Sequence, residues 1–410
     1  MEETTEATPL PDDVVREILL RVSAVDVATL FRCAVTCKQW RAVVADLSFL
    51  RQHWPEKAPH PSSVLGFFDS PYGNQWPLFI SPEKVLGARR RSLGSFLVAA
   101  APPDILNRAV PLAARGGLLV VRLPAWRLAG DSLRLAVCDI LKGTCDVLPP
   151  LQCRVSQCGC AILTREDCCS LDGQQAQTPS TGYSAFFKVL AMIVGTNDQD
   201  CNLYAFSSSQ ATWSEPRKCF DQVWQRDTFG LRIILRPSWA TVCRGVAYWL
   251  GSYSTDHRSS PRCFTFGVNV KTGETSSTEL LIPANQLSLP SFGRMLSVAD
   301  GNLSLLILQK EGLQLHTWTR GDDGRTWLRT RAIELKPPKQ VWDPVHVSIL
   351  SGEKSGALFM SDAYGFVYKT DPEKGAMQDV TEEMFHARLS FWAVPIEMDW
   401  PALFMSRLAV

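Results

Sequence analysis

The feature that most constrains this chain is a short helical block near its start, over residues 9–50. Apolar residues recur there at helical spacing in three runs, which predicts three short helices packed together. Pro11 suits the start of the first helix, and Asp12 and Asp13 place negative charge at the positive end of its dipole. A unit of about forty residues is at the lower limit of independent stability, because it buries little surface. Its apolar excess therefore predicts a docking surface.

Polar residues stand where the second and third helices should begin. Ser23 and Asp26 have the spacing of a capping box, so the second helix is predicted from Val27. Thr36 is the residue expected to cap the third helix.

Three sequence landmarks of this block occur together. They are Leu10-Pro11-Asp12-Asp13, Ile18-Leu19 and Val35-Thr36-Cys37-Lys38-Gln39-Trp40-Arg41. The combination resembles the F-box, whose third helix usually begins with Val-Cys; Thr36 shifts that start by one residue. The alternative is an ordinary helical cap packed on the domain that follows.

The resemblance implies that the block binds the Skp-type adaptor of a cullin-based (SCF-type) ubiquitin ligase. The adaptor-binding residues that it implies are Leu10, Pro11, Val14, Ile18, Leu19, Leu30, Val35, Cys37 and Trp40.

Length and charge limit the other functions. A chain of 410 residues exceeds what one core usually supports, so two units are expected. Its 42 basic and 41 acidic residues leave a net charge of +1, which favours neither nucleic acid nor an anionic membrane surface. The start is acidic and polar, no run of eighteen apolar residues occurs, and 13 cysteines suggest free thiols. We therefore expect a cytoplasmic or nuclear protein without membrane partners.

The pattern changes after the helical block. Three prolines within residues 52–63 predict an extended linker. We expect a disordered N-terminus over 1–8, the F-box over 9–51, the linker over 52–63 and a β domain over 64–410. Strands are predicted at 64–68, 95–99, 117–123, 133–138, 187–194, 202–206, 245–250, 263–269, 303–309, 313–318, 345–349, 356–360 and 365–369.

The predicted strands form a repeat. Hairpins centred on Gly143, Gly273, Gly324 and Gly375 recur at intervals near 50 to 65 residues, with a unit around Tyr204 between the first two. Such a period predicts a propeller-like array of about five to seven blades. The segment Asp322–Trp327 also fits the tail of the Asp-box turn, a structural β-hairpin of propeller blades.

The overall fold class is therefore α+β and multidomain, with a three-helix F-box followed by a large all-β propeller-like domain. This layout resembles plant F-box proteins with an associated propeller-like domain. The resemblance implies a non-catalytic substrate-recognition subunit that binds adaptor and cullin through the F-box and an unknown client protein through the β domain. Candidate client anchors are the aromatic residues Trp213, Trp224, Trp239, Trp342 and Tyr364.

The residues give little support to catalysis, a metal or a cofactor. Five cysteines at 153, 158, 160, 168 and 169 lack the paired spacing of zinc knuckles, and no histidine lies nearby. His316 alternates with apolar neighbours, as in a strand, and no nucleotide or hydrolase motif occurs. Two alternatives remain open: a propeller that binds a glycan or small ligand, and a glycosidase-like enzyme with a helical cap, which would need two carboxylates in a central pocket.

Overall fold

The computed structural model describes most of the chain. The described residues are 10–23, 27–55, 64–69, 78–81, 90–97, 103–124, 132–140, 142–168, 183–195, 201–219, 232–235, 239–254, 262–280, 294–299, 301–309, 313–321, 323–324, 326–338, 347–352, 358–362, 364–382, 384, 389 and 392–408. The expected disordered N-terminus over 1–8 and most of the expected linker, residues 56–63, lie outside them.

The N-terminal block is helical, as the apolar spacing predicts. The three expected helices are present and a fourth follows: α1 (Asp12–Ser23), α2 (Val27–Ala34), α3 (Lys38–Ala45) and α4 (Leu47–His53). Asp46 caps α4 by accepting a hydrogen bond from the Phe49 N–H at 2.9 Å. The helices bury one shared core that contains Val15, Leu19 and Leu30.

The predicted cap of the third helix was wrong by one residue. Cys37 is the N-cap of α3, and its Sγ accepts from the Trp40 N–H at 3.5 Å. The Thr36 hydroxyl instead donates to the Cys33 carbonyl at 2.7 Å, at the end of α2. Thr36 therefore closes the second helix rather than opening the third.

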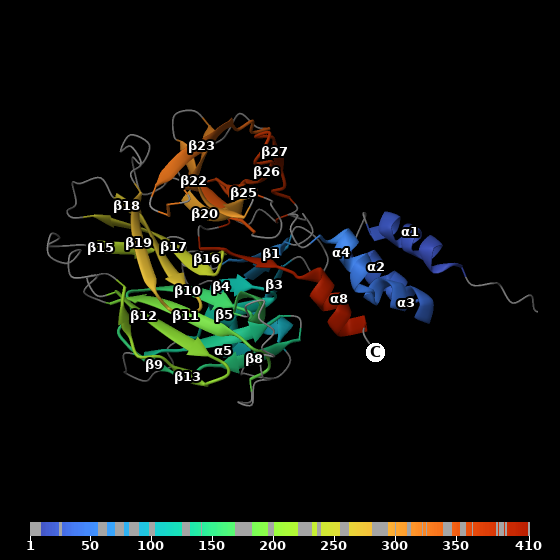
Figure 1. Ribbon diagram of the computed structural model, residues 1–410, viewed down its shortest axis with the longest axis horizontal. Helices are drawn as coiled ribbons and strands as arrows, with labels where there is room; N and C mark the ends of the chain where they lie inside the picture. Colours follow the sequence, from blue (N-terminus) through green and yellow to red (C-terminus); the bar gives the residue numbers. More distant parts are fainter. Residues whose placement is uncertain are drawn as a thin grey trace, which may run out of the picture.

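The rest of the described chain forms six antiparallel sheets arranged as the blades of a propeller (Figure 1). Blade 1 holds β1 (Val64–Asp69), β2 (Leu78–Ile80), β3 (Arg90–Ser92) and β28 (Val394–Glu397). Blade 2 holds β4 (Val110–Arg115), β5 (Leu118–Arg122), β7 (Leu135–Asp139) and β8 (Thr144–Val147). Blade 3 holds β10 (Gln157–Leu163), β11 (Lys188–Val194), β12 (Cys201–Ser207), β13 (Thr212–Trp213) and β14 (Arg217–Lys218).

The remaining blades follow in chain order. Blade 4 holds β15 (Arg232–Leu235), β16 (Thr241–Cys243), β17 (Val246–Ser254), β18 (Arg262–Asn269) and β19 (Thr275–Leu280). Blade 5 holds β20 (Arg294–Ala299), β21 (Asn302–Gln309), β22 (Gln314–Arg320) and β23 (Trp327–Glu334). Blade 6 holds β24 (Ser348–Ser351), β25 (Leu358–Ser361), β26 (Val367–Thr370) and β27 (Met377–Asp379). Smaller elements are the pair β6 (Ser132–Leu133) and β9 (Leu151–Gln152), helices α5 (Pro103–Asn107) and α6 (Arg165–Cys168), and the 3-10 helix η3 (Leu93–Phe96).

The ring closes through a strand from the far end of the sequence. β28 pairs antiparallel with β1, so blade 1 contains both the first and the last strand of the propeller. The first strands of neighbouring blades lie against one another around the centre: β28 on β4, β4 on β10, β10 on β15, β16 on β20 and β20 on β24. Phe67 of blade 1 packs edge-on against Phe359 of blade 6, with ring centroids 5.0 Å apart. Pairing of β28 with β1 covers the edge that the first strand would otherwise expose.

The C-terminal helix α8 (Trp400–Leu408) joins the propeller to the F-box helices. Two residues after β28 the chain enters α8, which packs on α3 and α4 (Figure 1). Phe404 stacks on Phe31 of α2 with ring centroids 4.0 Å apart and also contacts Trp54. The Arg41 guanidinium donates to the Leu408 carbonyl at 3.0 Å. One continuous apolar core therefore runs from the helices into blade 1.

The hairpin repeat is confirmed. Gly143, Gly273, Gly324 and Gly375 all have φ between 65° and 72°, and each joins the two outer strands of a different blade. Blade 3 uses Ala211 at the corresponding turn, with φ 58°. The Asp-box segment forms the hairpin between β22 and β23; there the Thr326 N–H donates to the Asp323 carboxylate at 2.9 Å.

One predicted strand was wrong. Residues 95–96 belong to the 3-10 helix η3, not to a strand. The Ser95 hydroxyl donates to the Ser92 carbonyl at 2.7 Å, and Phe96 packs against Phe68 and Phe79 of blade 1. The apolar run at this point therefore covers a blade instead of joining one. Among the described helices, none has the length and apolar character to cross a membrane.

Candidate functional site

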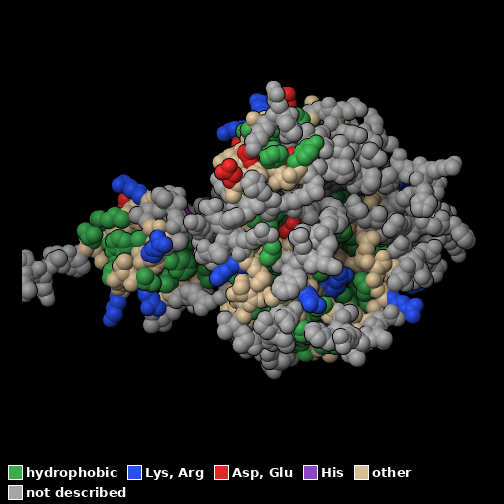
Figure 2. Space-filling view, turned by 180° about the vertical axis from the view of Figure 1, so that it is seen from behind, with side chains coloured by type: hydrophobic (Ala, Val, Ile, Leu, Met, Phe, Trp, Pro, Cys, Tyr) green, Lys and Arg blue, Asp and Glu red, His purple; other side chains and the backbone are tan. Residues whose placement is uncertain are grey.

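The first candidate site is an apolar surface on the F-box helices. Leu10, Val14 and Val35 are 47%, 40% and 75% exposed, and Pro11 and Cys37 are also exposed. The Gln39 side chain donates to the Leu10 carbonyl and the Asp12 carboxylate, which holds the start of α1 against α3. Figure 2 shows apolar side chains gathered on the helical lobe. We call Leu10, Pro11, Val14, Val35 and Cys37 the exposed F-box face.

The other predicted adaptor-binding residues lie deeper. Ile18 and Trp40 are half-buried, and Leu19 and Leu30 are fully buried in the core of the helices. A partner cannot touch Leu19 or Leu30 unless the helices open. These two residues hold the exposed F-box face in shape from below.

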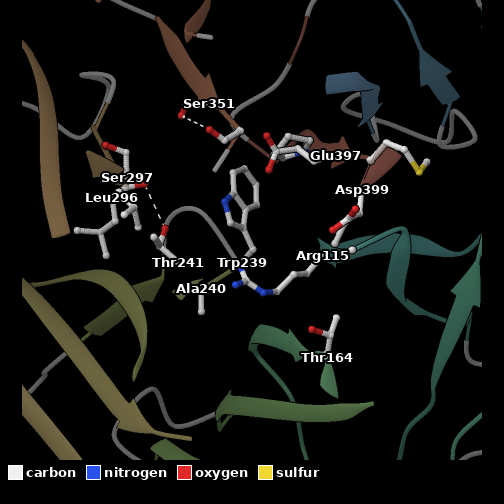
Figure 3. Close-up of a pocket in the computed structure, with 16 residues that line it drawn as sticks. Arg115, Thr164, Trp239, Ala240, Thr241, Leu296, Ser297, Ser351, Glu397 and Asp399 are labelled. Atoms are coloured by element: carbon white, nitrogen blue, oxygen red, sulfur yellow. Dashed lines mark hydrogen bonds between the residues drawn. The ribbon is translucent and has the colours of Figure 1, made fainter. Parts of the chain in front are cut away.

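The second candidate site is a cavity of about 190 Å³ at the centre of the propeller. Its lining comes from the innermost segments of all six blades, with Thr164 directly after β10, and from the loop before β16, so that residues nearly 300 positions apart meet (Figure 3). The polar and aromatic lining residues are Arg115, Thr164, Trp239, Thr241, Ser297, Ser351, Glu397 and Asp399.

Arg115 is held by a carboxylate beside the cavity. Its Nε and Nη2 each donate to the Asp167 carboxylate at 2.8 Å. The Thr164 N–H also donates to that carboxylate at 2.9 Å, which fixes Asp167 at the start of α6. A two-point pair of this kind holds the guanidinium in place and balances its charge.

Glu397 and Asp399 supply two carboxylates from one segment. Glu397 ends β28, and Asp399 directly precedes α8, the position where a helix favours Asp as its N-cap. Residues two apart in an extended segment point to the same side. Both side chains line the cavity.

Trp239 closes one side of the cavity. It is 8% exposed and lines the cavity. Figure 3 shows the ring between Thr241 on one side and Asp399 on the other. The Thr241 hydroxyl donates to the Leu296 carbonyl at 3.2 Å.

Trp239 is one of the five aromatic anchors predicted for a client. Trp213 instead belongs to blade 3, where its indole donates to the Pro149 carbonyl at 2.8 Å. Tyr364 is 65% exposed in the turn between β25 and β26. Trp224 and Trp342 lie outside the described residues.

Two of the five clustered cysteines, Cys158 and Cys160, are buried, and Cys153 and Cys168 are partly buried. Cys158 and Cys160 lie side by side in β10, with sulfurs 3.5 Å apart. A hydrogen bond with Cys158 and burial raise the pKa of the Cys160 thiol, and burial raises the pKa of Cys153 to about 11. Within the described part of the chain no group of His, Cys, Asp or Glu could hold a metal ion. Cys169 lies outside it.

His316 is a strand residue, as its alternating neighbours predict. It is buried in β22 and faces the Gln314 side chain at 3.3 Å. Burial and the nearby Arg329 lower its pKa, so the ring is neutral at neutral pH. Its surroundings keep it away from the central cavity.

Sequence reasoning missed Arg115, Glu397 and Asp399. No local pattern marks Arg115 or Glu397, because the cavity is assembled from segments that are distant in the chain. The Asp399-Trp400-Pro401 sequence is the one local signal, since Asp before a helix and Pro near its start are typical of an N-terminus.

Comparison with known proteins identifies the N-terminal part. Residues 9–52 match the F-box domain. No curated protein sequence matches the chain significantly.

Solved structures resemble the chain only distantly. The nidogen/laminin complex has a TM-score of 0.42 at 8% identity, over 81% of this chain and 97% of that one. An α-L-arabinanase of Penicillium chrysogenum with arabinobiose has a TM-score of 0.42 at 9% identity, over 72% and 86%. A protein from Lactobacillus plantarum has a TM-score of 0.41 at 11% identity, over 76% and 80%.

Proposed function

We propose, on the premise that residues 9–52 form an F-box domain, that this chain is the client-recognition subunit of a cullin-RING (SCF-type) ubiquitin ligase. The F-box docks on a Skp-type adaptor bound to the cullin, and the propeller binds a client protein. From the same role we infer that the chain acts in the cytosol or nucleus. The combination of F-box and propeller further suggests kinship with the plant F-box proteins of this layout.

Such a subunit acts by positioning and not by supplying a nucleophile. Holding the client near a charged conjugating enzyme raises the effective concentration of its lysines. The α8 contacts support this role, because Phe404 and Trp400 hold the helices on the propeller instead of leaving them on a free tether. A fixed spacing between adaptor and client favours transfer to lysines within a limited zone.

The observation that carries the proposal is the exposed F-box face. Leu10, Val14 and Val35 stay exposed even though α8 covers another side of the same helices. An exposed apolar patch on a small helical unit is typical of a protein-binding surface.

Charged substitutions on this face test the proposal. We expect Leu10→Glu with Val35→Glu to weaken binding to purified Skp-type adaptor by about 30-fold or more, the size of a hot-spot loss of about 2 kcal/mol. Leu328→Glu is the matched control, because Leu328 is 62% exposed on the outer strand of blade 5. Binding is measured by titration, and melting temperatures report on folding. Undiminished adaptor binding by the double variant would contradict the assignment.

One observation supports a second candidate function. A glycosidase or glycan-binding propeller needs carboxylates in a central pocket, and Glu397 and Asp399 both line the cavity. Both come from one segment, however, whereas glycoside hydrolysis uses carboxylates that flank the scissile bond. The geometry therefore favours client binding over sugar chemistry.

A further inference from the structure

Two cysteines face each other across the outer hairpin of blade 2. Cys138 of β7 and Cys145 of β8 are partners in the antiparallel register, and their sulfurs are 3.5 Å apart. Both are free thiols, Cys138 fully buried and Cys145 9% exposed. We propose that they form a redox-active dithiol, which a hydroperoxide converts to a disulfide that links β8 covalently to β7. This inference goes beyond the ligase role and does not rest on it.

The hydrogen bonds between β7 and β8 put this pair where a disulfide fits. The Leu148 N–H donates to the Leu135 carbonyl at 2.9 Å, so these two opposite residues are a hydrogen-bonded pair. Hydrogen-bonded and non-hydrogen-bonded pairs alternate along an antiparallel ladder, and Cys138 with Cys145, three positions further on, is therefore a non-hydrogen-bonded pair. Side chains are closest in such pairs, with Cβ atoms about 4.5 Å apart, at the upper end of the range of about 3.5–4.5 Å that a disulfide spans. A bond between the two sulfurs thus needs only a small local shift.

Two other cysteine pairs of the propeller lie in less suitable positions. Cys158 and Cys160 also have sulfurs 3.5 Å apart, but they are two positions apart on one strand. Cα atoms at that spacing are about 6.6 Å apart, near the upper limit for a disulfide. The Cys219 N–H donates to the Cys201 carbonyl at 2.9 Å, which makes these two a hydrogen-bonded pair with more distant Cβ atoms. The geometry therefore selects the pair in blade 2.

The two cysteines of this pair have different roles. The Cys138 thiol donates a hydrogen bond to the Cys145 sulfur, which lowers the pKa of Cys145 and raises the pKa of Cys138 well above its ordinary value. Cys145 also lies on the outermost strand of the blade, between the partly exposed residues Thr144 and Asp146. Outer strands open more readily than inner ones, because fewer contacts hold them. Cys145 is therefore the residue that reacts with the oxidant, and Cys138 is the residue that completes the disulfide.

Oxidation takes two steps, with hydrogen peroxide or an organic hydroperoxide as the oxidant. The Cys145 thiolate attacks one peroxide oxygen, and the O–O bond breaks as a sulfenic acid forms. The other oxygen leaves as water or an alcohol after it takes up the proton that the Cys145 thiol released. The Cys138 sulfur then attacks the Cys145 sulfur, the S–S bond forms, and the hydroxyl group leaves as water with the Cys138 proton. Two thiols are oxidised by two electrons in total, and the peroxide is reduced by two.

The disulfide would also hold a contact between blades 2 and 3. The Asp146 carboxylate in β8 accepts hydrogen bonds from the Ser184 N–H at 3.0 Å and from the Ser184 hydroxyl at 2.6 Å. We expect hydrogen exchange of the β8 amides to slow by about tenfold on oxidation, because the strand can no longer open freely. Exchange in β23, an outer strand without cysteine, is the internal control and should not change. Unchanged exchange in β8 after the disulfide has formed would overturn the proposed link between the strands.

Single substitutions separate the two roles. In Cys138→Ala the sulfenic acid on Cys145 has no partner, so its labelling by dimedone should exceed that of the wild type by about fivefold or more. In Cys145→Ala the remaining Cys138 should stay unlabelled. Cys219→Ala, at a cysteine that is 5% exposed, is the matched control and should keep the disulfide of blade 2. Equal labelling of the two single variants, each with a wild-type melting temperature, would overturn the assigned roles.

Peptide mapping of the unchanged full chain is the decisive test and needs no variant that could fail to fold. Reduced protein is treated with equimolar hydrogen peroxide, capped with iodoacetamide and digested with trypsin, which cuts after Lys142, between the two cysteines. We expect segments 135–142 and 143–154 to be joined by a bond that dithiothreitol breaks, and fragmentation distinguishes the two cysteines of the second segment. A disulfide that forms first at another cysteine pair, or Cys145 oxidised to the sulfinic acid without a link to its partner, would overturn the proposal.

Discussion

The helices and the propeller of this chain reach a stable core in opposite ways. Each blade packs its two faces against its neighbours, and the ring is completed by β28 beside β1. The four N-terminal helices instead take Phe404 and Trp400 from α8, a helix that follows the propeller. The helices therefore complete their core with residues from the far end of the chain, whereas the blades pack on one another. In the sequence, however, the F-box is the easier region to recognise, because it has clear landmarks and the blades have few.

The largest expected effect breaks the contact between the two regions. Phe404→Ala removes a fully buried ring from between Phe31 and Trp54 and should destabilise the helices by about 3–5 kcal/mol. We expect a separate, earlier loss of helical circular dichroism, followed by melting of the propeller at its usual temperature. Met405→Ala, at the next position and 39% exposed, is the control and should change stability by less than about 0.5 kcal/mol. A single transition in which helices and propeller of the Phe404 variant melt together would contradict this expected difference in stability.

A smaller effect weakens the helices alone. Asp46→Ala removes the cap of α4 and should lower the free energy of unfolding of the helices by about 1 kcal/mol. Hydrogen bonds from Ser48 and from the Phe49 N–H lower the pKa of Asp46. A lowered folded pKa gives stability that is present above the unfolded value and is lost as pH falls through the folded one, below roughly pH 4.

The acid limb of this prediction needs its own control. Asp46→Asn keeps a good cap but cannot ionise. The wild-type protein should therefore lose its higher free energy of unfolding relative to Asp46→Asn as the pH falls below roughly 4. Urea denaturation monitored by helical circular dichroism measures this difference. A constant difference between the two down to the acid limit would show that the Asp46 charge contributes nothing.

The smallest expected effect tests whether the blades share the same hairpin turn. Ala211 occupies with φ 58° a turn where four other blades have glycine. Ala211→Gly should stabilise the protein by about 1 kcal/mol, because a left-handed backbone is strained for a residue with a Cβ. The neighbour Gln210 has no positive φ, so Gln210→Gly should destabilise slightly. Chemical denaturation measures both, and a loss of stability in Ala211→Gly would contradict the shared turn.

What the sequence could predict depends on how each strand is buried. The second and third strands of the blades, such as β11 and β21, are buried on both faces and read as continuous apolar runs, so most were predicted. First strands such as β4 and β28 carry proline and polar residues because they border the cavity, and they were missed. The outer strand β23 is mostly exposed, so it has no apolar run, and it was also missed.

The two candidate sites also differ in how far the sequence predicts them. The exposed F-box face is built from neighbouring residues on short helices, so a linear pattern identifies it. The cavity joins Arg115, Trp239 and Glu397 from three blades, and closure of the ring alone brings them together. Of these, sequence reasoning named Trp239, and only as one aromatic among five.

The position of α8 also sets a schedule for synthesis. The F-box helices leave the ribosome roughly 350 residues before the helix that covers Phe31 and Trp54, which at about 5–20 residues per second is a delay of roughly 20 to 70 s. During that interval the helices lack part of their core while six blades are still being made. The nascent chain therefore exposes aromatic surface until α8 is made. Chaperones can bind this first-made part of the molecule for longer than any other part.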